Sequence, residues 1–371
     1  MAKLGEVCEV LDSKRVPITA ANRVSGQYPY YGANGVQDYV ADYIFDDELV
    51  LLAEDGGNFG SKEKPIAYRV SGKCWVNNHA HVLKPKAVID VDYLCYSLMF
   101  YDVSGLVNGA TRQKLTQSDM RKMEIPLRTM VEQKNIVCRL NKLTELISLR
   151  KQQLAKLDEL VKARFVEMFG DFEVNPKEFP VYHLCELCDV GSSKRIYQEE
   201  QSISGIPFLK VADLNELIDT GKYLCSTFIP LERYEQLLHK ELTPKENDIL
   251  ITSRGTLGKC YIVQLDDEFY FQDGMISWLS NLSPKVSSIY ISYLFAQPYI
   301  QKQIESLQAG STVAYLSIAM LKKMNVILPP KKLQDDFATF VEHVDQQKQT
   351  VQQSLEKLEL MKKALMQEYF G

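Results

Sequence analysis

Long apolar segments, a secretory leader and a disulfide framework are missing from this sequence of 371 residues. No stretch approaches the roughly 18 apolar residues that a membrane-spanning helix needs. The opening segment MAKLGEVCEVLDSKR lacks the apolar core of a signal peptide. The eight cysteines are scattered without regular spacing, which favours free thiols in a reducing compartment. We therefore expect a soluble, cytoplasmic protein.

Catalytic signatures are missing as well. Gly-Lys occurs at 72–73, 221–222 and 258–259, but the Ser or Thr that completes a nucleotide-binding P-loop follows none of them. The Asn-Pro-Pro-aromatic element of amino-methyltransferases and the Gly-x-Ser-x-Gly of hydrolases are absent. The sequence therefore predicts a chain without ATPase, methyltransferase or hydrolase chemistry of its own.

Two clusters contain metal-binding residue types. Cys185 and Cys188, with His183 just upstream, lack the second ligand pair that a structural zinc site usually needs. His79 and His81 are two residues apart, on one face of a predicted strand, without an acidic partner nearby in the sequence. We interpret both clusters as ordinary structural residues and expect no bound metal.

What the sequence does contain is typical of a globular protein: 46% hydrophobic and 25% charged residues, with a mean hydropathy of -0.19. Its length suits about two domains. The net charge of -5 divides into -1 for residues 1–128, +3 for 129–170, -6 for 171–330 and -1 for 331–371. Any contact with nucleic acid must therefore be local, or depend on a partner for part of the positive charge.

An internal repeat divides the chain in two. Residues 109–170 align with 310–371 at a constant offset of 201, without a gap and with sixteen identities in 62 positions. The identities extend from a non-helical stretch to a closing Phe-Gly in both copies. A weaker match pairs ELVLLAEDGG (48–57) with DILITSRGTLG (248–258). The chain is thus predicted to be a tandem duplication of one module of roughly 200 residues.

Each repeat ends in a segment without Pro or Gly, whose apolar residues recur four and three apart. Residues 129–170 and 331–371 are therefore predicted to form two helices of about 40 residues, each ~60 Å long. Their heptad pattern predicts an antiparallel coiled coil within the chain. The alternative of two separate helices, each covering its own domain, stays open at this stage. The residues expected to pair the helices are Leu143, Leu154, Leu157, Val344, Leu355 and Leu358.

The remaining regions, 1–128 and 171–330, are rich in Tyr, Val, Ile, Gly and Asn, which predicts strand-rich α+β domains. The predicted strands are 48–53, 66–70, 248–252 and 259–265, and the predicted helices are 91–100 and 288–304. The expected architecture is therefore a duplicated globular domain plus long helix, with domains at 1–128 and 171–330 and helices at 129–170 and 331–371.

Several segments carry a resemblance to a known family. They are, in the first repeat, SGQYPYYGANGV (25–36), LVLLAEDGGNFGSKEKPIAYRVSGKCWVNNHAHVLKP (49–85) and NGATRQKLTQSDMRKMEIPL (108–127). In the second repeat they are GIPFLKVADL (205–214), NDILITSRGTLGKCYIV (247–263), FQDGMIS (271–277) and AGSTVAYLSIAMLKKMNVILPP (309–330). Their order, the duplication and the long helices resemble the specificity subunit of type I restriction–modification systems, which serve bacterial defence.

This resemblance implies a non-catalytic DNA-binding subunit. Each globular region would be a target recognition domain that reads one half of a bipartite, asymmetric DNA sequence. The helices would set the spacing and dock two methyltransferase subunits, which bring S-adenosylmethionine. A separate restriction and translocase subunit would bring ATP and Mg²⁺. Two other interpretations, a nuclease or methyltransferase fragment and a pure coiled-coil scaffold, are disfavoured by the missing motifs and by the two globular domains.

The candidate DNA-contact residues are polar side chains in predicted loops. Arg and Lys suit guanine, Asn suits adenine, and Ser, Thr and Lys bind phosphates. In the first domain the candidates are Lys62, Lys64, Asn77, Asn78, His79, Thr111, Arg112 and Lys114. In the second domain they are Lys194, Arg195, Lys210, Arg254, Lys259, Ser311 and Thr312.

Overall fold

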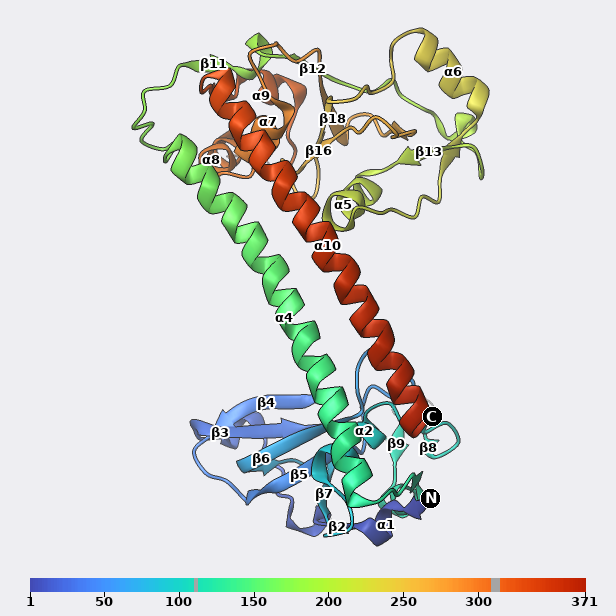
Figure 1. Cartoon of the computed structure of the whole chain (residues 1–371). Helices are drawn as coiled ribbons and strands as arrows, with labels where there is room; N and C mark the ends of the chain where they lie inside the picture. The colour runs from blue at the N-terminus through green and yellow to red at the C-terminus, as the bar shows by residue number, and fades with distance from the viewer. Residues whose placement is uncertain (110–112, 308–313) are drawn as a thin grey trace. The chain divides into compact units, whose positions relative to one another are not determined.

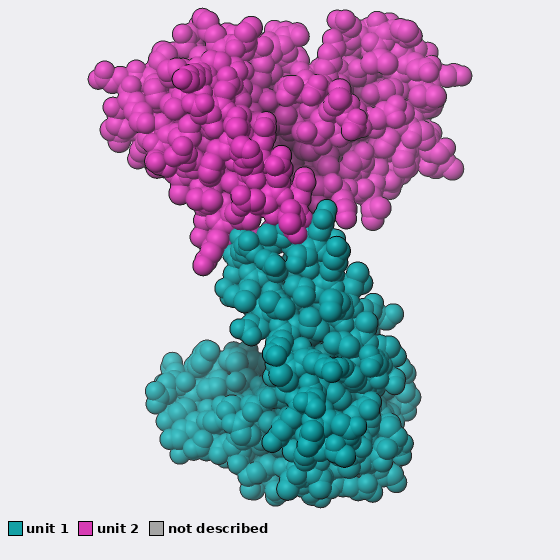
Figure 2. All heavy atoms as spheres, viewed as in Figure 1, with its two compact units in different colours: residues 1–153, 351–371 teal, residues 154–350 magenta. Residues whose placement is uncertain are grey.

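The computed structural model describes residues 1–109, 113–307 and 314–371 (Figure 1). The chain consists of two compact units. Unit 1 comprises residues 1–153 and 351–371, and unit 2 comprises residues 154–350 (Figure 2). Each unit contains one globular domain and part of each long helix. Among the described residues, no helix has the length and apolar character needed to cross a membrane.

The domain of unit 1 is built on a six-stranded sheet in the order β2-β7-β5-β6-β3-β4. Its central strand β5 is fully buried from Leu49 to Ala53. Leu49 and Leu51 pack in one apolar cluster and Val50 and Leu52 in another, because successive side chains of a strand point to opposite faces. The strands are β2 (Cys8–Val10), β3 (Ser25–Gly32), β4 (Gly35–Val40), β5 (Phe45–Ala53), β6 (Ala67–Val76) and β7 (Ala80–Pro85).

Short helices and two small sheets complete this domain. Helix α2 (Val91–Met99) starts at Asp90, whose carboxylate accepts hydrogen bonds from the Asp92 and Tyr93 amides, and it packs against β5, β6 and β7. The other elements are α1 (Leu4–Val7), α3 (Gln117–Lys122) and the paired strands β1 (Ala2–Lys3) with β10 (Glu124–Ile125) and β8 (Val107–Asn108) with β9 (Lys114–Leu115).

The domain of unit 2 splits its strands between a four-stranded sheet, β12-β18-β15-β16, a three-stranded sheet, β14-β13-β17, and the pair β11-β19. Its strands are β11 (Val181–His183), β12 (Asp189–Ser192), β13 (Ile206–Leu209), β14 (Phe228–Ile229), β15 (Ile249–Thr252), β16 (Cys260–Ile262), β17 (Tyr270–Phe271), β18 (Ile276–Ser280) and β19 (Asn325–Ile327). Its shorter helices are α5 (Val211–Thr220), α6 (Leu231–His239), α7 (Ser288–Phe295), α8 (Pro298–Leu307) and α9 (Ile318–Lys323).

One predicted helix is wrong in its extent. The stretch 288–304 forms two helices, α7 and α8, and Pro298 is the first residue of the second. Proline lacks the amide hydrogen that a continuing helix needs, but it suits a first helical position. The predicted strands at 48–53, 66–70 and 248–252 are confirmed as parts of β5, β6 and β15, whereas β16 covers only the start of 259–265.

The two long helices are α4 (Met130–Phe169) and α10 (Lys331–Phe370), each of 40 residues. Contacts within the units join them as follows: Arg139–Tyr369 and Lys151–Glu359 in unit 1, and Asp158–Lys348 and Arg164–Phe340 in unit 2. Within each unit, a higher residue number on α4 pairs with a lower one on α10. The helix halves therefore run antiparallel in both units.

A fully buried glutamine anchors the start of each long helix. In unit 1, Gln133 Nε2 donates to the carbonyls of Val88 (3.0 Å) and Arg128 (2.8 Å), and its Oε1 accepts from the Asp90 amide (2.8 Å). In unit 2, Gln334 makes the same three bonds to the Lys285 and Pro329 carbonyls and the Ser287 amide, at 3.0, 2.7 and 2.9 Å. Gln133 and Gln334 are one of the repeat identities, so this anchor is duplicated in full.

The closing Phe-Gly of each repeat also has an equivalent role. Phe169, at the end of α4, packs edge-on against Tyr290 in unit 2, with ring centroids 5.1 Å apart. Phe370, at the end of α10, packs edge-on against Tyr93 in unit 1, also at 5.1 Å. Each long helix thus starts from one domain and ends against the other.

Candidate nucleic-acid interface

Three segments of unit 1 meet beside the end of β5. The Glu54 amide donates to the carbonyl of His79 (2.9 Å), and the Leu115 amide donates to the carbonyl of Glu54 (2.7 Å). Asp55 forms an isolated antiparallel bridge with Lys114. The loop after β5, the turn before β7 and strand β9 are therefore held together, which brings the predicted contact residues Asn78, His79 and Lys114 into one region.

Lys62 and Lys64 are exposed in the loop between β5 and β6. Ser61 Oγ accepts hydrogen bonds from the amides of Glu63 (3.2 Å) and Lys64 (2.9 Å), which fixes the backbone from which both lysines project. In the part of the chain that the structure describes, neither lysine has a carboxylate partner. Both ammonium groups are thus available to a phosphate.

Asn77 has a different place from the one predicted. Its side chain is buried, with Nδ2 donating to Gln37 (3.0 Å) and Oδ1 accepting from the His79 amide (2.8 Å). The structure places Asn77 inside the turn, which it supports, rather than on its surface; its assignment as a contact residue stays a prediction. The histidine side chain of the turn, His79, is one-third exposed and pairs through Nδ1 with Asp55 (2.5 Å).

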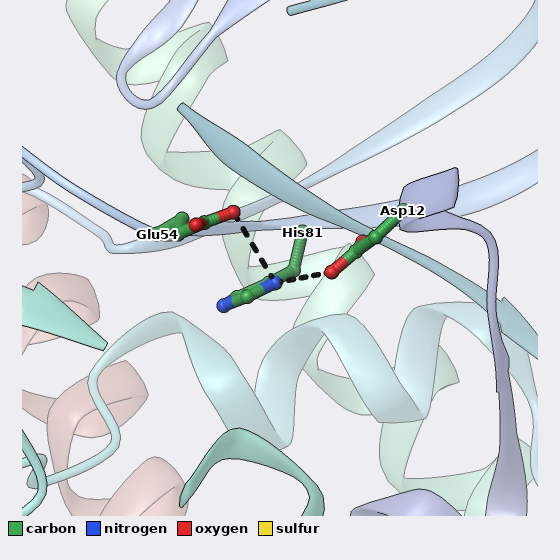
Figure 3. A group of neighbouring side chains, drawn as sticks. All are labelled: Asp12, Glu54 and His81. Atoms are coloured by element: carbon green, nitrogen blue, oxygen red, sulfur yellow. Dashed lines mark hydrogen bonds and ion pairs between the residues drawn. The ribbon is translucent and has the colours of Figure 1, made fainter. Parts of the chain in front are cut away.

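A buried charged network lies beneath this region (Figure 3). His81 is fully buried in β7, with Nδ1 2.6 Å from Asp12 Oδ2 and Nε2 3.0 Å from the Leu115 carbonyl. Glu54 lies between two cations, because its carboxylate is 2.6 Å from the Arg15 guanidinium and 3.0 Å from the Lys114 ammonium; His81 Nδ1 is 3.7 Å away. No local pattern could reveal this network, because Asp12 is 69 positions away from His81.

The hydrogen bonds fix the orientation of the His81 ring. The Leu115 carbonyl can only accept, so His81 Nε2 donates to it, while Nδ1 shares a hydrogen bond with Asp12. Burial alone would raise the pKa of Asp12, but hydrogen bonds from His81, Gln117 and the Val82 amide lower it below its ordinary value. The cations Arg15 and Lys114 lie beside the two carboxylates: Arg15 is 3.6 Å from Asp12 and 2.6 Å from Glu54, and Lys114 is 3.0 Å from Glu54.

The same contacts bear on metal binding. Asp12, Glu54 and His81 could each offer a ligand atom within 4.8 Å of the others. Both carboxylates already pair with Arg15, and His81 Nδ1 already bonds Asp12, so a metal ion would have to displace Arg15 from Glu54. Among the described residues, Cys185, Cys188 and His183 form no such group. Burial raises the pKa of the Cys188 thiol to about 12, as suits a structural cysteine.

In unit 2, the predicted residues Lys194, Arg195 and Lys210 lie beside the paired strands β13 and β17. Arg195 Nε is 2.9 Å from Asp273, and the Lys194 amide donates to the hydroxyl of Tyr270 (2.8 Å). Strand β13, which ends just before Lys210, pairs with β17, which ends just before Gln272. Lys210 is exposed overall, although its ammonium bonds Thr227 (2.8 Å).

Arg254 and Lys259 are close in sequence but differ in availability. Arg254 is exposed, and its guanidinium lies 5.3 Å from the ring centroid of Tyr315. Within the described ranges, Arg254 makes no ion pair. Lys259 is half-buried and bonds both oxygens of Asp219, at 2.6 and 2.8 Å. Arg254 is therefore the better placed of the two to meet a base or a phosphate.

The hydrogen bonds beside the strand ends show which positions of the units are equivalent. The Glu54 amide donates to the His79 carbonyl (2.9 Å), as the Ser253 amide donates to the Met275 carbonyl (2.9 Å). Leu52 therefore pairs with His81 across β5 and β7 as Ile251 pairs with Ser277 across β15 and β18. The weaker match of 48–57 with 248–258 thus acquires a definite alignment, in which Val50 corresponds to Ile249, one residue away from an alignment of Glu48 with Asp248. A one-residue shift matters because it moves every side chain to the other face of the sheet.

With this register, the two units present different chemistry at the same positions. The isolated bridge of Asp55 with Lys114 in unit 1 corresponds to the bridge of Arg254 with Tyr315 in unit 2. The bond from the Leu115 amide to the Glu54 carbonyl corresponds to that from the Leu316 amide to the Ser253 carbonyl. The candidates Thr111, Arg112, Ser311 and Thr312 lie outside the described residues.

Of the predicted helix-pairing residues, Leu143, Leu157, Val344 and Leu355 are buried, whereas Leu154 and Leu358 are only half-buried. Leu154 is three residues from the buried Leu157, as Leu358 is from Leu355. Three residues correspond to about 300° around a helix of 3.6 residues per turn, so such a side chain lies about 60° to one side. Both half-buried leucines are thus placed at the edge of a buried stripe.

Comparisons with known proteins agree with this architecture. The family described as type I restriction modification DNA specificity domain matches residues 1–159 and 176–360. A putative type I restriction enzyme specificity subunit of Haemophilus influenzae is 32% identical over 89% of this chain and 83% of its own length. The MjaVIII specificity subunit of Methanocaldococcus jannaschii is 23% identical over 99% of this chain and 90% of its own.

The fold also matches a solved structure. The S subunit of the type I restriction–modification system from M. genitalium superposes with a TM-score of 0.62, at 16% identity, over 100% of this chain and 95% of that one. Two matched segments of the specificity family, together with a relative above 30% identity, leave the nuclease, methyltransferase and scaffold interpretations unsupported. The chain therefore belongs to the family of type I restriction–modification specificity subunits, non-catalytic proteins with two DNA recognition domains.

Proposed function

We propose that each globular domain reads one half of a bipartite, asymmetric DNA sequence. The observation that carries this proposal is the difference at equivalent positions: Asp55 and Lys114 in unit 1, Arg254 and Tyr315 in unit 2. A carboxylate and a guanidinium have opposite preferences at a base edge, because the first accepts and the second donates hydrogen bonds. Two such domains suit two different half-sites.

The long helices would fix the spacing between the half-sites and dock two methyltransferase subunits. Exposed apolar side chains along both helices support docking, because a helix surface that faces only water has little use for them. They include Leu146, Leu149, Leu160, Leu360 and Met361. S-adenosylmethionine would bind to the methyltransferases, and ATP and Mg²⁺ to a restriction and translocase subunit. The complex would act in the cytoplasm.

Exchange of one domain tests the proposal. Residues 1–128 are replaced by the equivalent region of a relative, and the methylated sequence is mapped across the genome of cells that express the chimaera. We expect one half-site to change and the other to stay the same. A chimaera in which both half-sites change together would contradict independent reading and would indicate that both domains clamp one continuous site.

A further inference from the structure

One site has the same backbone arrangement in both units, but its side chains are ionisable in unit 1 and neutral hydroxyls in unit 2. Val10 pairs with Leu83 as Val190 pairs with Leu279, so Asp12, two residues later, corresponds to Ser192. Glu54 corresponds to Ser253, and His81 corresponds to Ser277, as shown above. Three ionisable side chains in unit 1 thus stand where unit 2 has three hydroxyls.

The hydroxyl site of unit 2 is satisfied within itself. Ser253 Oγ and Ser277 Oγ are 2.7 Å apart, and both residues are buried. Ser192 Oγ bonds the Ile276 carbonyl (3.2 Å) and the Gly274 amide (3.2 Å). In unit 2 a neutral group of hydroxyls occupies the equivalent positions, so charge at this site is particular to unit 1.

Lys114 connects the charged site of unit 1 to the protein surface. Glu54 is buried, and its carboxylate holds the ammonium of Lys114 at 3.0 Å, while the side chain of Lys114 remains half exposed. Arg15 holds the same carboxylate from the inner side and also bonds the Ala80 carbonyl (2.8 Å). The Glu54 carboxylate is thus fixed from within and presents its other oxygen to Lys114.

We propose that Glu54 is a positioning residue for DNA recognition by the domain of unit 1, and that it acts through Lys114. This inference rests on the proposed function. A free lysine is a flexible point charge that any phosphate attracts. An ammonium bonded to a fixed carboxylate keeps two donors and loses much of its freedom before DNA arrives, so it favours a ligand atom at one position.

Unit 2 positions its cation by a different contact. At the place of Lys114 it has Tyr315, whose ring lies against the guanidinium of Arg254. A planar guanidinium can be held by an aromatic face, whereas a lysine ammonium is better held by a carboxylate. Each recognition domain therefore has one oriented cation beside the end of its central strand.

A double-mutant cycle tests the proposal. The full chain, in complex with its methyltransferase subunits, carries Glu54→Gln, Lys114→Ala or both. Competition binding with duplexes substituted in either half-site measures the ratio of specific to non-specific affinity. We expect each single variant to lower the ratio at the first half-site roughly tenfold, and the double variant to be no worse than Lys114→Ala alone. Discrimination at the second half-site should not change.

Two variants serve as controls. Glu63→Gln removes the same charge from an exposed residue of the same loop, and Ser253→Ala changes the equivalent position of unit 2; neither should alter the first half-site. If Glu54→Gln lowers the midpoint of thermal unfolding, Glu54→Asp replaces it in the cycle, because it keeps the carboxylate and shortens its reach.

Three results would contradict different statements. Losses from Glu54→Gln and Lys114→Ala that multiply would show that Glu54 does not act through Lys114. A Glu54 variant that behaves as Glu63→Gln does would overturn the positioning role. A wild-type complex that does not discriminate between duplexes would overturn the proposed function itself.

Discussion

The two units are alike where they meet the long helices and unlike where their central strands end. Gln133 and Gln334 make the same three hydrogen bonds, and the Phe-Gly ends of both helices pack on equivalent tyrosines. Beside the central strands, unit 1 has a charged network at the positions where unit 2 has a group of hydroxyls. The duplication thus repeats the frame and varies the surface that the frame supports.

The frame itself is not equally strong in both units. In unit 2, Phe169 is fully buried among four other rings, those of Phe165, Phe172, Tyr290 and Phe337. In unit 1, Phe370 is half-buried and touches only Tyr93 and Tyr369 among the described aromatic residues. Equivalent residues therefore contribute different stability.

The largest effect is expected from removing the aromatic ring of Phe169. Phe169→Ala should lower the free energy of unfolding by about 3–5 kcal/mol, because the lost ring leaves a cavity in a buried cluster. Phe370→Ala should cost clearly less, because its ring is already half exposed. Urea unfolding measures both, with the exposed Phe100→Ala as a control. Equal losses at 169 and 370 would contradict the asymmetry.

The next effect concerns the duplicated glutamine. Gln133→Ala and Gln334→Ala should each cost about 2–4 kcal/mol, because each leaves an amide and two carbonyls without their partner. The two losses should be similar, since the hydrogen bonds are the same. Gln152→Ala and Gln353→Ala are matched controls: they are also identical in the repeats but exposed, and should cost less than about 0.5 kcal/mol.

The charged network should make unit 1 sensitive to acid. The folded-state pKa of Asp12 lies below its ordinary value of 3.8, so its carboxylate stabilises the fold above that value and loses this effect as the pH falls through the folded pKa. Asp12→Asn should cost about 1.5–3 kcal/mol at pH 7.

The difference between wild type and Asp12→Asn should shrink as the pH falls below about 4. Urea unfolding at pH 7 and near pH 3 measures it. Ser192→Ala, at the equivalent position of unit 2, should show a loss that does not vary with pH over this range. A constant difference for Asp12→Asn would mean that the carboxylate is not ionised in the fold.

A similar loss is expected in DNA binding by unit 2. Arg254→Ala should cost about 1–3 kcal/mol at one base pair of the second half-site, if the guanidinium reads guanine. Lys259→Ala is the control, because Lys259 is already paired with Asp219, and it should change binding little. Uniform weakening on all sequences, with the salt slope reduced by about one, would instead assign Arg254 to a phosphate.

The smallest effect is expected on the helices. Lys151→Ala and Glu359→Ala should each cost only about 0.2–1 kcal/mol, because their ion pair is largely exposed. Raising the salt concentration should remove most of the difference. The free energy of unfolding is measured by urea unfolding. A much larger loss of this free energy would show that the ion pair is needed for the antiparallel arrangement.

The sequence alone determined the duplication, both long helices and the principal strands. These features depend on periodicity and on local punctuation by Pro and Gly, which a single chain displays directly. The resemblance to type I specificity subunits predicted the family, and the family match together with the relative at 32% identity confirmed it. A helix of 40 residues with a heptad pattern leaves little freedom to the tertiary structure, so α4 and α10 begin and end within one or two residues of the predicted ranges.

Only the tertiary structure decided which polar residues are buried and which positions of the repeats correspond. Asn77 and His81 are both polar, yet each is buried because distant segments supply its partners: Gln37 for one and Asp12 for the other. The strand register likewise follows from pairing across the sheet, which local sequence does not encode. Long-range contacts therefore separate the residues that hold the recognition surface from those that form it.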